Sequence, residues 1–250
     1  MPKGLYKAIR DPSRKNPNPV VFSTQGARQS SRQAWRHLLC HACEQRFNHD
    51  GERWTCANMA KSDGKFGLRD LLMANTAYVV DDDLHYFTST EIDEIDADAL
   101  GYFAFSVVWR AAVSAWTFDG NKFDRLELGK YEDSISNFLL GKSALPSEVA
   151  VNLVVSSERV PLLVAAVPRT SVGECHAHWL DIPGMQFIVH VGSRLPEYAR
   201  ACCLFRGEGR PILFSSVSQR RSIKDVMSLL DGHRRGLVNK EGIPPSHRER

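Results

Sequence analysis

Residues 97–117 are the segment that most limits how this chain can fold. Apolar side chains recur at four-residue spacing along two adjoining stripes, a periodicity that predicts a helix. Arg110 is the one charge in the interior of this segment. Because a helix that is apolar over most of its circumference must be buried, we expect it to be the central helix of the fold. The two stripes are Phe103, Val107, Ala111 and Ala115, and Leu100, Ala104, Val108 and Ala112.

The character of the sequence changes after Pro146, where short β-rich segments alternate with turn signals. Their regular spacing and short connections favour an antiparallel meander over β-α-β units. The first half is instead helical, with a further helix predicted over residues 34–49, at least from Cys40 onward, and an amphipathic one over 124–140. The chain is therefore predicted to be an α+β protein. The predicted strands are 150–156, 161–167, 176–182, 185–191, 202–206 and 211–216.

Four regions follow from these patterns. A basic extended arm covers residues 1–36, with Val20–Ser23 as its one predicted strand, and a helical subdomain covers 37–145. A β-rich subdomain covers 146–220, and a last helix at about 221–231 leads into a basic tail that ends at 250. The two central subdomains either share one core or form separate ones.

The net charge of +3 conceals an uneven distribution. Residues 1–36 contain eight lysines and arginines against one aspartate, and residues 220–250 contain eight against four acids. The middle of the chain has a net charge of −8, so basic ends flank an acidic body. Such ends are typical of phosphate binding, although solvated chain termini have the same composition.

The composition also restricts the class of protein. With 43% apolar and 24% charged residues, the chain is globular rather than disordered. No apolar run approaches the roughly 20 residues that a membrane helix needs, so no membrane association is expected. Six cysteines are too few for a disulfide scaffold, and no signal peptide is recognisable. We therefore expect a cytoplasmic protein whose cysteines serve a metal or catalysis.

The most informative motif is the run from Leu38 to Phe47, which contains Cys40 and Cys43 at Cys-x-x-Cys spacing. Two thiolates at this spacing can reach one tetrahedral Zn²⁺, and a zinc site needs two further ligands. The nearest candidates are His49 and Cys56, with His41 between the two knuckle cysteines. The motif therefore predicts a structural zinc knuckle.

The Leu-Leu-Cys-x-x-Cys-Glu-x-Arg-Phe pattern of residues 38–47 resembles the distal half of HNH-type endonucleases, in which such a knuckle opens the helix of a treble-clef ββα-metal site. The Trp109-Arg110 pair inside an apolar helix is similar to a pair in a bacterial subgroup of these proteins. Gly4-Leu5-Tyr6 and the run from Asn16 to Pro19 are also similar to that subgroup.

The resemblance implies phosphodiester hydrolysis assisted by a divalent metal, Mg²⁺ or Mn²⁺. Glu44 takes the position of a metal-holding residue, and His41 beside it is the second candidate catalytic residue. No cysteine and no histidine precede His37, so the first knuckle and the catalytic base of the family are missing. The chain is therefore expected to be a degenerate or truncated HNH-like protein in a bacterial or phage context.

The expected partner is DNA or another nucleic acid. A non-catalytic protein–protein interaction component with a structural knuckle is the alternative. Buried Arg110 is expected to have a carboxylate partner, for which Glu44 is a candidate. The candidate nucleic-acid-binding residues are Arg10, Arg14, Lys15, Arg28, Arg32, Arg36 and Arg46.

Overall fold

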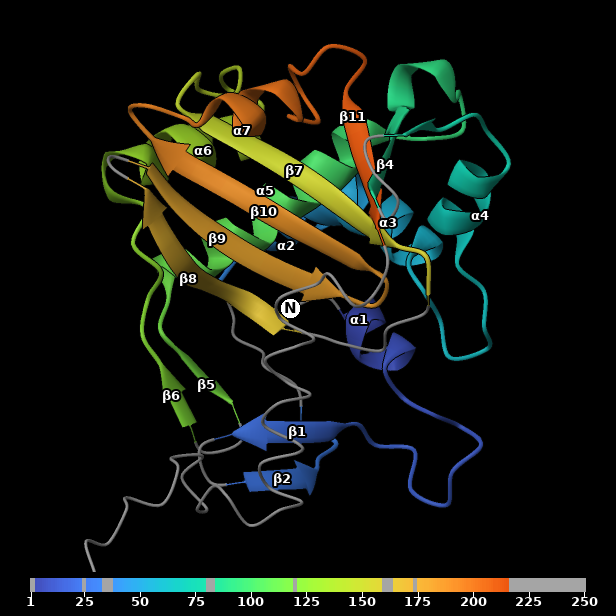
Figure 1. The fold of residues 1–250 in the computed structure, drawn as a ribbon. Coiled ribbons are helices and arrows are strands. Elements are labelled where there is room, and N and C mark those ends of the chain that lie inside the picture. Colours follow the sequence, from blue (N-terminus) through green and yellow to red (C-terminus); the bar gives the residue numbers. More distant parts are fainter. Residues whose placement is uncertain are drawn as a thin grey trace, which may run out of the picture.

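A seven-stranded sheet packed against one long helix, α5, forms the body of the protein (Figure 1). The structure is a computed structural model. A single large apolar cluster joins α5 to the inner face of the sheet and to the helices of the first half, as expected for the α+β class. The structure describes residues 3–23, 26–32, 38–79, 84–118, 121–158, 164–172 and 175–215.

Helix α5 (Ala97–Val113) confirms the predicted central helix. The side chain of Asp96 accepts a 2.8 Å hydrogen bond from the Ala99 N–H and so caps the helix start. Thirteen of its 17 residues are buried, Arg110 included. The helix ends earlier than predicted: Ser114 is extended, and β5 (Trp116–Phe118) follows, because the aromatic and β-branched residues there suit a strand.

A second helical segment packs on α5. It consists of α2 (His41–Phe47), a π-helical turn η1 (Asn48–Glu52) and α3 (Arg53–Asn58), without a break. The prediction of a helix from Cys40 onward is confirmed, but the helix continues past residue 49. Phe47 fixes it to α5, with its ring edge-on to Tyr102 and to Trp109 at centroid distances of 5.8 and 6.0 Å.

The sheet is only partly the predicted meander. Its order is β3-β4-β11-β7-β10-β9-β8, and within the β-rich half β8, β9 and β10 alone are antiparallel neighbours in chain order, as β3 and β4 are in the first half. Strand β7 pairs antiparallel with β10, and β11 pairs parallel with β7. Strands β3 and β4 from the first half extend the same sheet. The bounds are β3 Tyr78–Val79, β4 Leu84–Thr88, β7 Val149–Ser156, β8 Val164–Val172, β9 Cys175–Ile182, β10 Met185–Gly192 and β11 Pro211–Ser215.

Two predicted elements are wrong in detail. No strand forms over 202–206, because this segment turns after α7 (Glu197–Ala201), with the Gly207 N–H donating to the Cys203 carbonyl. The helix predicted over 124–140 begins only with the 3-10 turn η3 (Gly129–Tyr131) and continues as α6 (Glu132–Leu139). Residues 124–128 instead follow a hairpin of β5 and β6 (Asn121–Phe123).

The remaining elements are short. In the basic arm, Val20–Ser23 forms a strand as predicted, β1, but it pairs antiparallel with a second one, β2 (Gly26–Gln29). The other elements are α1 (Lys3–Ala8), α4 (Gly67–Met73) and the 3-10 turn η2 (Ser89–Glu91). No helix in the described part of the chain is long and apolar enough to cross a membrane. The helix and tail predicted for 221–250 lie outside the described residues.

Candidate functional site

The described part of the basic arm contains the short helix α1 and the strands β1 and β2. Strands β1 and β2 form a two-stranded ribbon that lies apart from the main sheet, at the end of the molecule opposite α6 (Figure 1). The loop between α1 and β1 closes on itself, since the Asp11 N–H donates to the Pro17 carbonyl at 3.1 Å.

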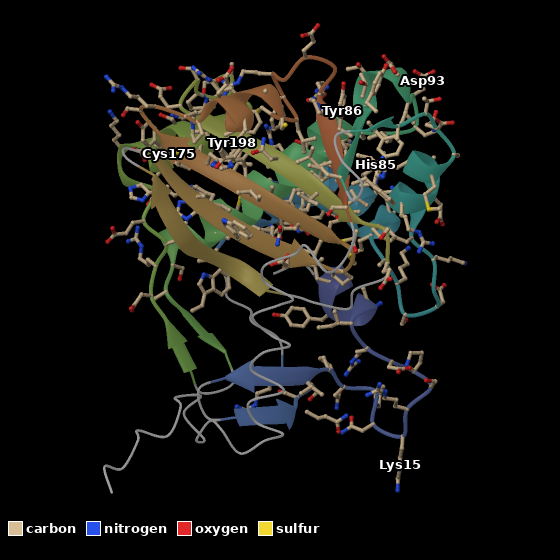
Figure 2. All side chains as sticks on the ribbon, viewed as in Figure 1. Lys15, His85, Tyr86, Asp93, Cys175 and Tyr198 are labelled. Carbon is tan, nitrogen blue, oxygen red and sulfur yellow. The ribbon has the colours of Figure 1, made fainter. Side chains whose placement is uncertain are left out.

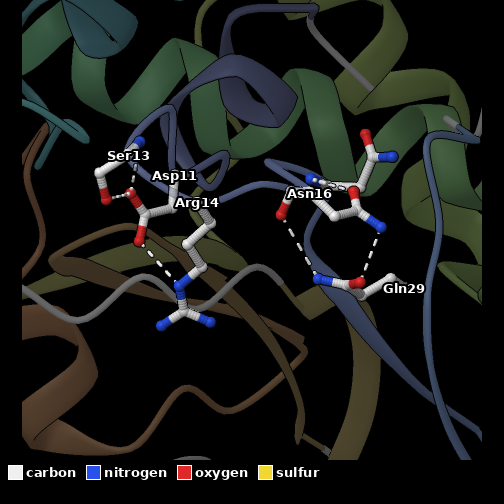
Figure 3. A network of polar contacts seen from close by, with 6 residues as sticks. Asp11, Ser13, Arg14, Asn16 and Gln29 are labelled. Carbon is white, nitrogen blue, oxygen red and sulfur yellow. Dashed lines mark hydrogen bonds and ion pairs between the residues drawn. The ribbon is translucent and has the colours of Figure 1, made fainter.

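Side chains tie this loop to the ribbon (Figure 3). The Asn16 side-chain amide donates a 2.7 Å hydrogen bond to Gln29 Oε1, and Gln29 Nε2 donates back to the Asn16 carbonyl at 3.4 Å. The Asp11 carboxylate accepts from Ser13 Oγ at 2.5 Å and from Arg14 Nε at 2.9 Å. These contacts lower the pKa of Asp11, first through the Ser13 hydroxyl and N–H, so Asp11 is ionised at neutral pH and holds the Arg14 guanidinium.

The predicted nucleic-acid-binding side chains of the arm are exposed where the structure describes them. Arg14 is 68% exposed, and Arg10, Lys15 and Arg32 are exposed as well. Arg10 donates to Asn18 Oδ1 at 2.8 Å, and Lys15 points away from the body at the far end of the loop (Figure 2). Arg36 and the side chain of Arg28 lie outside the described part.

Arg46 is placed differently from the arm residues. It lies on α2, and its Nη1 donates a 2.6 Å hydrogen bond to the Leu140 carbonyl at the C-terminal end of α6. A cation at a helix C-terminus satisfies a free carbonyl and the helix dipole. The structure thus gives Arg46 a structural contact and does not join it to the arm.

The Cys-x-x-Cys turn begins the long helical segment. Cys40 is the N-cap of α2 and is exposed, and Cys43 is partly exposed on the first turn. The pKa of Cys40 is lowered by the backbone N–H and the thiol of Cys43, whereas the pKa of Cys43 is raised because its thiol donates to Cys40. Cys40 and Cys43 thus lie one helical turn apart at the start of this segment.

The structure does not bring the other predicted zinc ligands to this pair. Cys56 lies 13 residues beyond Cys43 on the continuous helical segment, roughly 20 Å along its axis. Its sulfur faces Gly4 of α1, and burial raises its pKa to about 12. His49 is 73% exposed and lies 2.7 Å from its neighbour Asp50. Among the residues described, no group of three His, Cys, Asp or Glu side chains is arranged to hold a metal ion.

The two predicted catalytic residues, His41 and Glu44, lie one helical turn apart and are exposed. Behind them, Glu44 Oε2 lies 3.7 Å from Arg110 Nη2, the partner that the sequence suggested. The shorter contact was missed: Arg110 Nη1 donates to Glu52 Oε1 at 2.6 Å. The guanidinium also lies 4.8 Å from the centre of the Phe47 ring.

Glu52, Asn16 and Gln29 are the residues with site contacts that sequence reasoning missed. Glu52 gave a weak signal, since it lies eight residues after Glu44 and so near the same face of a helix. No local signal pointed to Asn16 and Gln29, because their contact depends on pairing of β1 with β2.

Comparison of the chain with family models, with curated proteins and with solved structures finds no match.

Proposed function

We propose that this chain is a nucleic-acid-associated protein that holds a duplex on its basic arm. The observation that carries the proposal is the two-stranded ribbon β1–β2, with exposed arginines and a lysine around it. The major groove of B-DNA, about 12 Å wide, admits a ribbon of this kind.

The order within the arm supports a binding surface. A charged segment without fixed structure loses conformational entropy when it binds. Here the Asn16–Gln29 hydrogen bonds and the Asp11 turn already hold the loop that carries Arg14 and Lys15. Asp11 accepts a hydrogen bond from Nε of Arg14, so the other two guanidinium nitrogens can donate to a phosphate. Cations positioned in this way bind phosphates without sequence preference.

The HNH-like resemblance of residues 38–47 belongs to the same proposal. Two segments carry this resemblance: the cysteine run, which includes Glu44, and the helix with the Trp109-Arg110 pair. The ion pair between Glu44 and Arg110 brings these two segments together and supports the proposal. We propose a protein of this type that binds without cleaving, since the Glu44 carboxylate is engaged by Arg110. We further propose that the protein acts in the cytoplasm. Its six free cysteines support this, because thiols stay reduced in that compartment.

Binding is tested by fluorescence anisotropy of a labelled DNA duplex over a series of salt concentrations. Arg14→Ala with Lys15→Ala should weaken binding and reduce the slope of log K against log salt by about one for each phosphate that is no longer neutralised. The matched control is Lys130→Ala with Lys142→Ala, two exposed lysines at the α6 end of the molecule. Equal losses of affinity in both double variants would overturn the assignment to the arm.

Cleavage is tested separately with supercoiled plasmid and Mg²⁺ or Mn²⁺. We expect no nicking by the wild type. Nicking that disappears in both Glu44→Ala and Cys43→Ser would instead establish a hydrolase and overturn the non-cleaving part of the proposal.

A further inference from the structure

The cysteine turn offers chemistry that nucleic-acid binding does not use. Cys40 is exposed, Cys43 is partly exposed, and the two lie one helical turn apart. The chain approaches the turn from an anchored position, because Leu39 packs against the core. On the other side, the Glu44 N–H donates to the Cys40 carbonyl at 3.0 Å, so the backbone between the two sulfurs is already fixed.

The spacing suits a covalent bond between the two sulfurs. In an ideal helix, Cα atoms three residues apart are about 5 Å from each other. Disulfides span Cα distances of about 4.4–6.8 Å. Rotation of two side chains therefore suffices to close the bond, and the helical backbone does not have to unwind.

We infer that Cys40 and Cys43 form a redox-active dithiol that exchanges with small-molecule disulfides such as oxidised glutathione. Cys40 is the attacking residue because it is the more exposed of the two and lies at the N-cap, outside the first helical turn. Cys43 is the resolving residue. This inference is independent of the proposed nucleic-acid binding.

The exchange balances in two steps. The Cys40 thiolate attacks one sulfur of the disulfide, whose S–S bond breaks, and the released thiolate takes up a proton. Cys43 then loses its proton and attacks Cys40 in the mixed disulfide, which releases the second small thiol. Two protein thiols are oxidised to one disulfide, and one small disulfide is reduced to two thiols.

The other cysteines provide internal controls. Cys56 is partly buried against α1 and its pKa is raised to about 12, so at neutral pH it holds almost no thiolate. Cys175 and Cys203 are buried, and burial also raises the pKa of Cys175. Selective reaction at the turn is therefore expected without any change to these residues.

The experiment uses the full chain, reduced and treated with a chelator, in buffers of increasing oxidised-to-reduced glutathione ratio. Free thiols are blocked, and the tryptic peptide of residues 37–46 is followed by mass spectrometry. Trypsin cuts after Arg36 and Arg46, so this peptide contains Cys40 and Cys43 and no other cysteine. We expect it to lose two hydrogens at a defined glutathione ratio, while the peptide with Cys56 stays alkylated.

Two variants test the order of attack. Cys43→Ser should accumulate a glutathione adduct on Cys40, and Cys40→Ser should react at least about tenfold more slowly at Cys43. Cys56→Ser should behave as the wild type.

Two results would overturn the inference. One is a 37–46 peptide that remains reduced at ratios that oxidise the same cysteines in the urea-unfolded chain. The other is zinc that copurifies in stoichiometric amount and is absent from both Cys40→Ser and Cys43→Ser, since the pair would then be a metal site. Because the readout contains no nucleic acid, failure of DNA binding does not affect it.

Discussion

Arg110 and Glu52, 58 residues apart in the sequence, form a 2.6 Å hydrogen-bonded ion pair between α5 and the end of η1. Arg110 is 6% exposed and the Glu52 side chain 13%, so water screens the pair poorly. Glu44 approaches the same guanidinium from the first turns of α2. This cluster therefore links the cysteine turn to the central helix.

Arg110→Met is expected to destabilise the protein by roughly 3–5 kcal/mol, because it leaves the Glu52 carboxylate buried without its partner. Glu52→Gln retains an oxygen acceptor and should cost less. The measurement is urea unfolding of both variants. Lys65→Ala serves as the control, since Lys65 is 80% exposed and pairs with Asp63 at 3.7 Å. If Arg110→Met unfolds at the same urea concentration as Lys65→Ala, the pair does not hold these helices together.

Stability is expected to fall as the pH drops from about 6.5 towards 4. His178 and His190 are almost fully buried, and burial lowers the pKa of each to about 4. In the unfolded chain both histidines take up protons near pH 6.5, whereas in the folded chain they stay neutral until about pH 4. The free energy of unfolding therefore falls by roughly 1–3 kcal/mol for each histidine as the pH drops. Neither ring nitrogen of His178 has a hydrogen-bond partner among the described residues.

The pH effect is measured by urea unfolding at a series of pH values from 7 to 4. His178→Leu should flatten the plot of unfolding free energy against pH, since it removes a group that must stay neutral in the folded protein. Exposed His41→Gln should leave the curve unchanged. An unaltered slope in His178→Leu would contradict the assignment to this residue.

Gly51→Ala is expected to destabilise the protein by about 1–3 kcal/mol, although alanine normally favours a helix. A Cβ at Gly51 would lie 2.8 Å from the backbone nitrogen of Phe103, which cannot rotate away. A Cβ at Gly101 would instead overlap the ring of Phe205, which is a side chain and can be replaced by a smaller one. Thermal unfolding should show that Phe205→Leu offsets part of the loss in Gly101→Ala and none of that in Gly51→Ala.

Gln29→Ala should weaken DNA binding by a severalfold change in Kd without altering its salt dependence. The variant removes the hydrogen bonds that hold the Asn16 loop on β2, but it removes no cation, so the number of displaced counterions stays the same. The measurement is duplex anisotropy at three salt concentrations, with exposed Gln45→Ala on α2 as the control. A smaller slope of log K against log salt in Gln29→Ala would contradict this, since it would mean that the variant also loses a phosphate contact.

The sequence predicts those parts of the fold that depend on local periodicity. The stripes of α5 and the short β-rich segments that form β7, β9 and β10 are specified by residues close in the chain. The order of the strands in the sheet is not specified locally, because β11 pairs with β7 and β4 through residues more than 50 positions apart in the sequence. The partner of Arg110 shows the same limit within the site: Glu44 was foreseeable from its motif, whereas Glu52 requires the path of the helix to be known.

That path depends on one helical turn of unusual width. In η1 the Arg53 N–H donates to the Asn48 carbonyl, five residues back, so the turn contains one residue more than an α-helix would have. Deletion of a single residue here would restore ordinary winding and leave the residues on either side on their present faces, because the wide turn has already absorbed the extra residue. Ordinary winding with all the residues kept would instead rotate everything before the turn by about 100° relative to α3. Cys40, Cys43 and Glu44 would then face away from Arg110 while every amino acid of the cluster was still present. The winding of this one turn thus decides whether Glu44 reaches the central helix.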